Sequence, residues 1–507
     1  MAEANAVTPP LQTAAATLEK AKLRKVLSRI DLVLFTACAI LGFDTVAASA
    51  EAGAQAITWL LISLVIFLIP YGMLTAELGS AFPVEGGPYE WARLAFGRCA
   101  GSVTAILYWL SNPTWIGGTL TASAIAALDG LVLHKPLGTT AEIIVGLAFV
   151  WVTVAIAIVA FRIGKWGPNI GTFVKIAVVL LFTGLFIAFI AQHGRPHGTS
   201  GAGDFKPTLS GFLVSIGILV FMWVGFELST GAAEEMRNPQ RDVPRMILRS
   251  GLVAAVLYAL VIGGIVLVIP KASLSNVSGF ADAFTNVSAT LHSHALDVTF
   301  SVLVIITLVC SGAVWLEGAD RTQAIAALDG AAPSWMGRFT SFGTPIAVNL
   351  SSGVVASVMC VIVFVATSGS LASFFSIMLS LTISSTAVGY FFIFPALLIL
   401  RRKYPNAARP YRVPGGRAGA WAAVIITELF VIVTAITLLW PGAINALFGQ
   451  SYSIEAGYSV SRPFFEWVTL GSLAGMIALG LVFWQLGERT RKAGLTGISI
   501  PADTAEG

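Results

Sequence analysis

The feature that most constrains this chain is a series of apolar runs that recurs from Leu32 to Leu486, separated by short polar breaks. About 20 predominantly apolar residues cross the hydrocarbon core of a bilayer as one helix. Only 11% of the 507 residues are charged, whereas an average soluble domain has about 25%. The chain is therefore predicted to be an all-α, polytopic membrane protein in contact with lipid, rather than a set of soluble domains.

The runs predict twelve transmembrane helices, followed and preceded by polar tails at residues 1–29 and 488–507. The first run begins near Asp31 behind a leader too long for a signal peptide, so we expect it to stay in the mature protein. Residues 401–417 form a basic loop before the last two helices, at 418–487. The predicted spans are 31–56, 57–80, 99–128, 140–161, 169–192, 209–236, 248–270, 296–328, 346–368, 371–400, 418–440 and 465–487.

The placement of basic residues predicts the orientation of these helices. With the N-terminus inside, the cytoplasmic segments carry 24 of the 30 lysines and arginines, and the outer loops carry 5. Cytoplasmic loops of membrane proteins are enriched in exactly these two residue types. Both termini are therefore predicted to be cytoplasmic, in a protein of the cell membrane.

Several other classes of protein are excluded or disfavoured by the sequence. It contains neither a GxxxxGK[ST] phosphate loop nor a GxSxG elbow, so ATP hydrolysis and serine-hydrolase chemistry are disfavoured. The basic residues lie between apolar runs, which argues against binding of nucleic acid. No histidine lies near a Cys or Glu at metal-ligand spacing, so no metal site and no cofactor are predicted. The histidines, all in predicted loops, are His134, His193, His197, His292 and His294.

An internal repeat points to the middle of the membrane. The first span contains Gly42-Phe43-Asp44-Thr45, and the sixth contains Gly225-Phe226-Glu227, offset by 183 residues or five spans. Because five is odd, the second copy enters the membrane from the opposite side. Paired, interrupted helices in two inverted halves indicate a transporter binding site. The alternative is a chance similarity between two short strings in glycine-rich helices.

Other strings carry a resemblance to a known family. They are Thr75-Ala76-Glu77-Leu78-Gly79, Gly86-Gly87-Pro88-Tyr89, Ala233-Glu234-Glu235-Met236-Arg237-Asn238-Pro239 and Leu328-Asp329-Gly330-Ala331-Ala332-Pro333. In this order they resemble the amino acid–polyamine–organocation (APC) superfamily, amino acid permease type. The resemblance implies the five-plus-five inverted-repeat fold of leucine-transporter type, with residues 30–193 and 209–400 as the repeats, plus two C-terminal helices. It also implies secondary transport of amino acids or related amines, coupled to protons or to exchange.

The first broken helix departs from the family pattern. Many family members have a Gly-small-Gly string whose free N–H groups hold the substrate carboxylate, but here Asp44 replaces the second glycine. An ionised acid repels an α-carboxylate unless it is protonated or paired. We expect Asp44 to face a substrate amine or to titrate, and the alternative is a structural acid bonded to Thr45 or Ser49.

Two further ionisable residues lie at membrane depth, where such groups are costly and usually functional. Glu227 matches a family acid linked to gating or pH response, and the alternative is a cap for the N–H groups of the second half-helix. Lys175, in the fifth span, matches a lysine of proton-coupled family members. The resemblance implies that this lysine takes the place of the sodium ion of sodium-coupled relatives. The alternative for Lys175 is that its long stem extends to the cytoplasmic interface. Lys175 and Glu227 are the predicted proton-coupling residues.

Two aromatic residues match the family by motif position. Phe221 corresponds to an aromatic that covers the substrate, and Trp315 corresponds to a tryptophan that shapes the pocket; either ring offers a cation–π contact to an amine. The sequence does not predict which way Tyr108, Asn112 and Trp115 of the third span point, because Pro113 lies among them. The predicted substrate-binding residues are Gly42, Phe43, Asp44, Thr45, Phe221, Gly225, Glu227 and Trp315.

The predicted function is secondary active transport of an amino acid or related small amine by alternating access, as proton-coupled symport driven by the proton gradient. An amino acid or amine exchanger and a polyamine or organocation transporter remain alternatives, and a non-transporting nutrient sensor is an alternative of another class. An enzyme is disfavoured because it would need a nucleophile–base pair or metal ligands at membrane depth, and no histidine lies there. The protein is expected to be a monomer or a homodimer.

Overall fold

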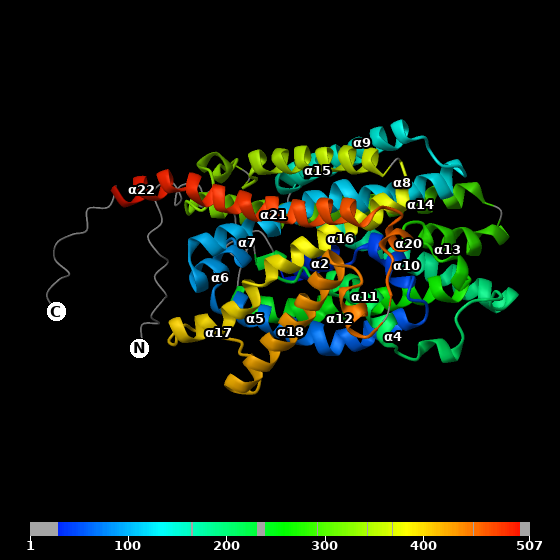
Figure 1. Ribbon diagram of the computed structural model, residues 1–507, viewed down its shortest axis with the longest axis horizontal. Helices are drawn as coiled ribbons and strands as arrows, with labels where there is room; N and C mark the ends of the chain where they lie inside the picture. Colours follow the sequence, from blue (N-terminus) through cyan, green and yellow to red (C-terminus); the bar gives the residue numbers. More distant parts are fainter. Residues whose placement is uncertain are drawn as a thin grey trace.

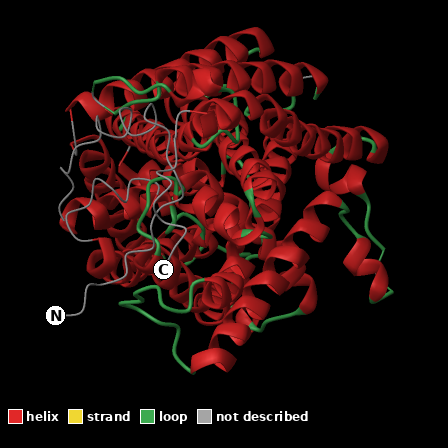
Figure 2. Cartoon of the chain, turned by 90° about the vertical axis from the view of Figure 1, so that its left-hand side faces the viewer, coloured by secondary structure: helices red, strands yellow, loops and turns green. Residues whose placement is uncertain are grey.

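The apolar runs form long helices that lie side by side along the longest axis of the molecule (Figure 1). This computed structural model describes residues 29–163, 166–230, 239–291, 293–341, 343–367, 369–449 and 451–496. The described residues form helices joined by loops and contain no strand (Figure 2). The last described helix, α22 (Glu488–Thr496), lies at the end of the bundle where α6 (Gly87–Phe96) and α17 (Ile393–Lys403) are found (Figure 1).

The first half of the chain supplies five spans. They are the pair α2 (Arg29–Ile40) and α3 (Phe43–Ala50); α4 (Gln55–Ser63), η1 (Leu64–Leu68) and α5 (Ile69–Ala81); α7 (Arg98–Trp115), η2 (Ile116–Leu120), α8 (Thr121–Leu128) and η3 (Asp129–Leu133); α9 (Thr139–Ile163); and α10 (Trp166–His193). The short helix α6 (Gly87–Phe96) joins the second and third spans.

The second half supplies the other spans. They are α11 (Leu209–Trp223); α12 (Pro239–Val268); α14 (His294–Leu328); α15 (Ile346–Ala366); α16 (Leu371–Tyr390) and α17 (Ile393–Lys403); α18 (Gly416–Leu439); and α21 (Arg462–Leu486), followed by α22 (Glu488–Thr496). Short helices α13 (Gly279–Ser288), α19 (Ala443–Leu447) and α20 (Ile454–Tyr458) lie in the connections.

These helices match the predicted spans. Within the described residues, eleven helices are long and apolar enough to cross a membrane, and the bent pair α2 and α3 makes a twelfth. The seventh helix differs, because α12 begins at Pro239 rather than near residue 248. The first turns of α12 carry charged residues, so hydropathy alone does not predict that these turns belong to the helix. Of the tails predicted at 1–29 and 488–507, residues 1–28 and 497–507 lie outside the described residues, whereas Glu488–Thr496 form α22. Ala233 to Asn238 of the family motif also lie outside the described residues.

The side chains are distributed as lipid contact requires. Large apolar residues on the outer helix faces are exposed, among them Leu61, Val65, Leu180 and Leu429. Most of the buried charged and polar residues instead lie between helices. A helix bundle in lipid places its polar groups inside in this way, because the hydrocarbon offers them no hydrogen-bond partner.

The two halves of the chain are interleaved. The first broken span contacts helices of the second half, since α2 packs against α12 and α14, and α3 packs against α11 and α13. The third span, α7, lies against α14, α15, α16 and α21. The interruptions of the first and sixth spans are therefore brought together in the middle of the bundle.

The contact between the third and ninth spans depends on a glycine. A Cβ atom at Gly117 would lie 2.2 Å from the backbone oxygen of Ala356. Small residues allow such close approach between membrane helices. We expect Gly117→Ala to lower the free energy of unfolding by about 1–3 kcal/mol, the usual cost of overpacking. Thermal unfolding of the purified protein in detergent measures this change.

Gly184→Ala provides the matched control on the lipid-facing surface of α10. No atom lies within 4 Å of a Cβ added at Gly184, and alanine favours a helix over glycine. Its unfolding temperature should equal or exceed that of the unmodified protein. Equal stability of the two variants would contradict the close helix contact.

Candidate functional site

The first span is interrupted at Leu41 and Gly42, where α2 and α3 meet at an angle of 45°. A broken helix leaves backbone groups unpaired, and at membrane depth they need partners. Tyr258 of α12 supplies two of them: its hydroxyl accepts from the Gly42 N–H at 2.9 Å and donates to the Ile40 carbonyl at 2.6 Å. The Thr45 hydroxyl donates to the Gly42 carbonyl at 2.9 Å.

The sixth span is interrupted at Val224 and Gly225, directly after α11. Gly225 has φ of +123°, a backbone conformation that favours glycine because it lacks a Cβ atom. Its N–H donates to the hydroxyl of Tyr71 at 3.1 Å. A Cβ atom there would lie 3.5 Å from Ile40 and 2.9 Å from Trp315. The two interruptions are therefore in contact.

Lys175 lies beside the first interruption. Its side chain is 1% exposed, and its Nζ donates to the carbonyl of Cys38, to the carbonyl of Leu41 at 2.5 Å and to the Ser311 hydroxyl at 2.6 Å. The ammonium group thus joins the fifth span to the broken first span and to the eighth. It points into the bundle and not toward the interface.

Asp44 receives both of its hydrogen bonds from the third span. Its Oδ2 accepts from Trp115 Nε1 at 2.7 Å and from the Thr119 hydroxyl at 2.8 Å. These donors differ from Thr45 and Ser49, which the sequence suggested. Oδ1 is buried and has no hydrogen-bond partner among the described residues. Asp44 therefore has one carboxylate oxygen available to a further donor.

The local structure of the third span explains why Trp115 and Thr119 face Asp44. Pro113 interrupts the hydrogen bonding of α7, because proline has no N–H group. The π-helical turn η2 follows directly. Such turns shift the register of side chains and are frequent at functional sites. The effect of the proline on facing was the point that could not be read from the sequence.

Glu227 lies just after the second interruption and is fully buried. Three tyrosine hydroxyls donate to its carboxylate: Tyr71 to Oε2, Tyr108 to Oε1 at 3.0 Å, and Tyr390 to Oε1 at 2.5 Å. They come from the second, third and tenth spans. The carboxylate therefore ties three spans to the broken sixth one. Residues 231–238, where the second half-helix would begin, lie outside the described residues, so the cap that the sequence offered as an alternative stays untested.

Removal of one of these donors should be costly. We expect Tyr390→Phe to lower the free energy of unfolding by about 1.5–3 kcal/mol, the range for a hydrogen bond to a charged group. Thermal unfolding in detergent measures this change. Tyr452→Phe is the control, since Tyr452 is 40% exposed in a connecting loop. A Tyr390→Phe variant as stable as that control would show that the hydroxyl contributes nothing.

A small cavity lies beside the first interruption. Of the predicted substrate-binding residues, Gly42, Thr45, Phe221 and Trp315 line it. Trp115 adds a third large ring, in edge contact with Phe221 at 5.9 Å and with Trp315 at 6.1 Å between ring centroids. The remaining lining residues are Ala39, Ile40, Met222, Val224 and Tyr258.

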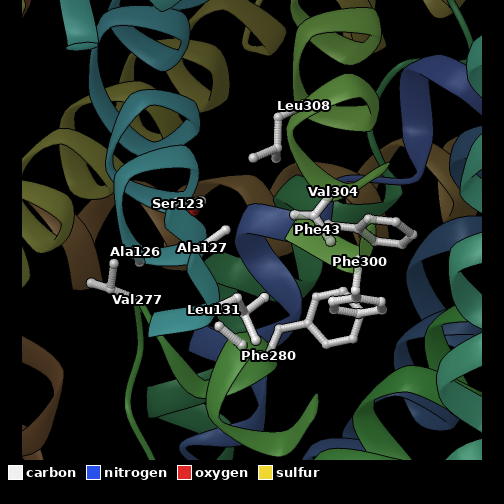
Figure 3. Close-up of a pocket in the computed structure, with 11 residues that line it drawn as sticks. Phe43, Ser123, Ala126, Ala127, Leu131, Val277, Phe280, Phe300, Val304 and Leu308 are labelled. Atoms are coloured by element: carbon white, nitrogen blue, oxygen red, sulfur yellow. The ribbon is translucent and has the colours of Figure 1, made fainter. Parts of the chain in front are cut away.

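The other predicted residues do not line this cavity: Asp44, Gly225 and Glu227 line neither cavity, and Phe43 lines a second one. The second cavity is almost entirely apolar and also contains side chains of α8, α13 and α14 (Figure 3). The Phe43 ring lies 5.4 Å from that of Phe280. Neighbouring residues of the first span thus line two different cavities, Gly42 and Thr45 the first and Phe43 the second.

Ion pairs close the end of the bundle where α6, α17 and α22 lie. Glu77 is fully buried and binds Arg401 of α17 at 2.5 Å, while Arg409 lies 3.5 Å away. It also accepts from the Val413 N–H at 2.7 Å. The sequence predicted Glu77 only as part of a family string. Its partners lie more than 320 residues away in the chain and gave no sequence signal.

Two further acids are paired at the same end: Asp329, which belongs to a family string, and Glu85, which directly precedes one. Glu85 lies 3.3 Å from Arg321, and both side chains are fully buried. Asp329 binds Arg98 at 3.0 Å and accepts from Tyr89 at 2.6 Å. Burial and the charge of Asp329 raise the pKa of Tyr89 well above its ordinary value, so this phenol stays protonated and donates.

Comparison with known proteins gives consistent results. The profile of a family described as amino acid permease matches residues 27–454. A probable agmatine/putrescine antiporter of Lactococcus lactis is 29% identical over 426 residues, which cover 82% of this chain and 89% of that protein. A branched-chain amino acid permease of Bacillus subtilis is 26% identical over 453 residues, covering 84% and 92%.

The fold is also similar to solved structures. A point mutant of the manganese transporter of Eremococcus coleocola superposes with a TM-score of 0.59, over 95% of this chain and 99% of that chain, at 14% identity. The same transporter in complex with an aromatic bis-isothiourea compound gives 0.58. At this identity the likeness concerns the fold alone. It confirms the predicted five-plus-five inverted repeat with two further helices.

Proposed function

Because the chain belongs to the amino acid permease family and is a membrane transporter rather than an enzyme, we propose that it moves a small solute with a protonated amine. The observation that carries this proposal is the unpartnered Oδ1 of Asp44, next to the aromatic cavity at the first interruption. A cation in that cavity gains both a carboxylate partner and cation–π contacts with the tryptophan rings. The substrate is an amino acid or a related amine.

Asp44 occupies a favourable position for this role. Trp115 and Thr119 hold Oδ2, so the carboxylate keeps its orientation whether or not a ligand is bound. A Cβ atom at Gly42 would lie 2.9 Å from Oδ1, so the absence of a side chain at Gly42 leaves this oxygen uncovered. The geometry supports a preorganised acceptor for an ammonium group.

Uptake into proteoliposomes tests the proposal. The purified protein is reconstituted, and the uptake of labelled agmatine, putrescine, leucine and isoleucine is measured with and without unlabelled solute inside. We expect saturable uptake of at least one amine-bearing solute, with acceleration by internal substrate. If the unmodified protein shows no saturable flux of amines or amino acids, the nutrient-sensor alternative is supported instead.

Coupling to protons is the proposed driving force. Lys175 supports it, since a single buried ammonium contacts the carbonyls of the first interruption and Ser311 of the eighth span. Gain or loss of its proton would alter the contact between these two spans. Exchange is the second candidate, because one relative is named as an agmatine/putrescine antiporter. Accumulation driven by an imposed pH gradient, with no internal substrate, distinguishes symport from exchange.

The orientation follows the charge bias, and we expect both termini in the cytoplasm. The end of the bundle where α6, α17 and α22 lie holds Arg98, Arg321, Arg401 and Arg409 in ion pairs. A reporter enzyme that functions only in the cytoplasm should be active when it is fused after Gly507. A reporter that functions only outside the cell should be inactive at the same position. A reporter active only on the outer side would contradict this orientation.

A further inference from the structure

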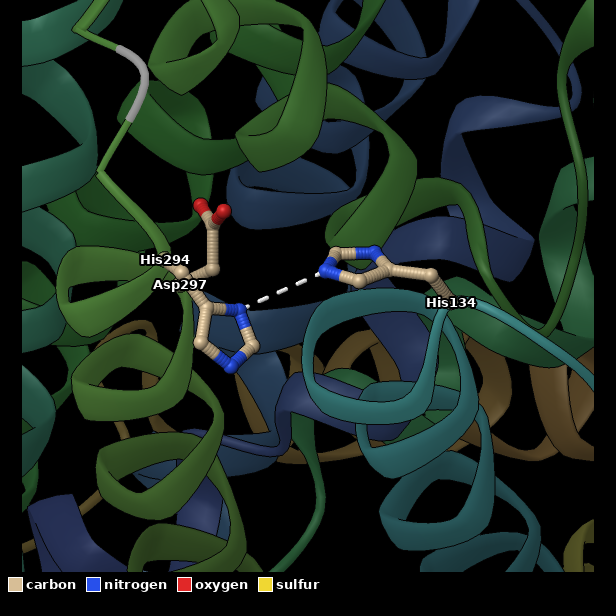
Figure 4. A group of neighbouring side chains, drawn as sticks. All are labelled: His134, His294 and Asp297. Atoms are coloured by element: carbon tan, nitrogen blue, oxygen red, sulfur yellow. Dashed lines mark hydrogen bonds between the residues drawn. The ribbon is translucent and has the colours of Figure 1, made fainter.

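Two histidines far apart in the sequence meet at the end of the bundle opposite α22. His134 directly follows η3 at the end of the third span, and His294 is the first residue of α14. Their ring nitrogens, Nε2 of His134 and Nδ1 of His294, are 3.5 Å apart (Figure 4). Asp297 lies one turn further along α14, and the ligand atoms of all three residues lie within 4.8 Å of one another.

The spacing suits a shared metal ion. Two imidazole nitrogens bound to one zinc ion at 2.0–2.1 Å in tetrahedral geometry are about 3.4 Å apart, close to the distance between His134 and His294. Two imidazoles with one carboxylate form a donor set for late first-row divalent ions, whereas Mg²⁺ and Ca²⁺ prefer oxygen ligands alone.

The surroundings hold these side chains in place. The Ser288 hydroxyl donates to Oδ1 of Asp297 at 2.7 Å, which orients the carboxylate as second partners of metal ligands do. His134 has φ of +51°, so its backbone turns sharply after the helix and directs the ring toward α14 (Figure 4). Both histidines are exposed and Asp297 is half-buried, so water can complete the coordination.

We propose that His134, His294 and Asp297 form a binding site for a divalent transition-metal ion of the Zn²⁺ type. The site joins the end of the third span, from the first half of the chain, to the start of the eighth span, from the second half. A bound ion would link these two spans at the end of the bundle opposite α22. The proposal is independent of the transported solute.

Isothermal titration of the full-length protein in detergent with Zn²⁺, after removal of any polyhistidine tag, tests the site. We expect about one high-affinity ion per chain. His134→Ala and His294→Ala should each weaken this binding at least tenfold, because each removes one of three protein ligands. Asp297→Asn, which keeps the shape but removes the charge, should weaken it severalfold. His197→Ala, which removes an exposed histidine elsewhere, should bind as the unmodified protein does.

Thermal unfolding provides a second measurement. Zn²⁺ should raise the unfolding temperature of the unmodified protein, Mg²⁺ should not, and a chelator should reverse the effect. In the presence of chelator all variants should unfold together, which shows that the substitutions leave the fold intact. Equal Zn²⁺ affinity in the unmodified protein, His134→Ala and His294→Ala would overturn the proposal and leave an imidazole–imidazole hydrogen bond only.

Discussion

Lys175→Ala is expected to abolish proton-driven accumulation of substrate, with at least a tenfold loss, while substrate binding stays measurable. The ammonium group is the donor to two carbonyls at the first interruption and to Ser311. Without it, the contact between the first and eighth spans no longer depends on a proton. Uptake into proteoliposomes under an imposed pH gradient measures the loss, and a thermal-shift assay measures binding.

The same substitution should also lower stability. The carbonyls of Cys38 and Leu41 would lose a buried donor, at a cost of about 1–3 kcal/mol for each unsatisfied group. Lys175→Met keeps most of the side-chain volume without the charge, and it separates loss of coupling from loss of packing.

Ser311→Ala is the control for this prediction. It removes one of the three acceptors and keeps the ammonium group, so accumulation should be reduced only in part. Undiminished proton-driven accumulation in Lys175→Ala and Lys175→Met would show that Lys175 has no part in coupling.

Asp44→Asn is expected to lower the affinity for amine substrates at least tenfold, which corresponds to about 1.4 kcal/mol. An ionised carboxylate 4 Å from an ammonium group contributes about 4 kcal/mol at an effective dielectric constant of 20. The asparagine carbonyl can still accept from Trp115 and Thr119, so the local structure should persist while the charge is lost. Equilibrium binding of labelled amines to the purified protein measures the change.

Thr119→Val is the matched control. It removes one donor to Oδ2 and leaves the charge of Asp44, so its effect on amine affinity should be much smaller. Asp44 would be only a structural acceptor if Asp44→Asn bound amines as tightly as the unmodified protein. Tight binding of a ligand without an amine would contradict the substrate class itself.

Several features of the fold were predictable because they depend on local composition. The free-energy cost of moving a residue into a bilayer depends on the polarity of that residue, so apolar runs predict the spans. Acids and bases within these runs are easily recognised. Asp44, Lys175 and Glu227 were found in this way, and all three side chains are buried in the structure. The interruptions at Gly42 and Gly225 were predictable for the same reason. The early start of α12 at Pro239 was not, because charged residues occupy its first turns.

The partners of these residues were decided by tertiary packing. Tyr71, Tyr108 and Tyr390 converge on Glu227 from three spans, yet a tyrosine in an apolar helix looks the same in the sequence whether or not it faces an acid. Trp115 and Thr119 reach Asp44 only because Pro113 and η2 change the facing of the third span. Phe43 lines a different cavity from its neighbours Gly42 and Thr45, and this too depends on how the helices pack around the first span.

The contrast is sharpest at the two ends of the bundle. The sequence by itself determined that this is a membrane protein of twelve spans with two interrupted helices, since burial of apolar surface and the cost of buried charge act on each segment separately. Only the tertiary structure brought His134 to His294, 160 residues away, and Glu77 to Arg401, 324 residues away. Such pairs form when whole helices pack against one another. Helix packing depends on the shapes of many side chains at once, and a local sequence pattern does not contain that information.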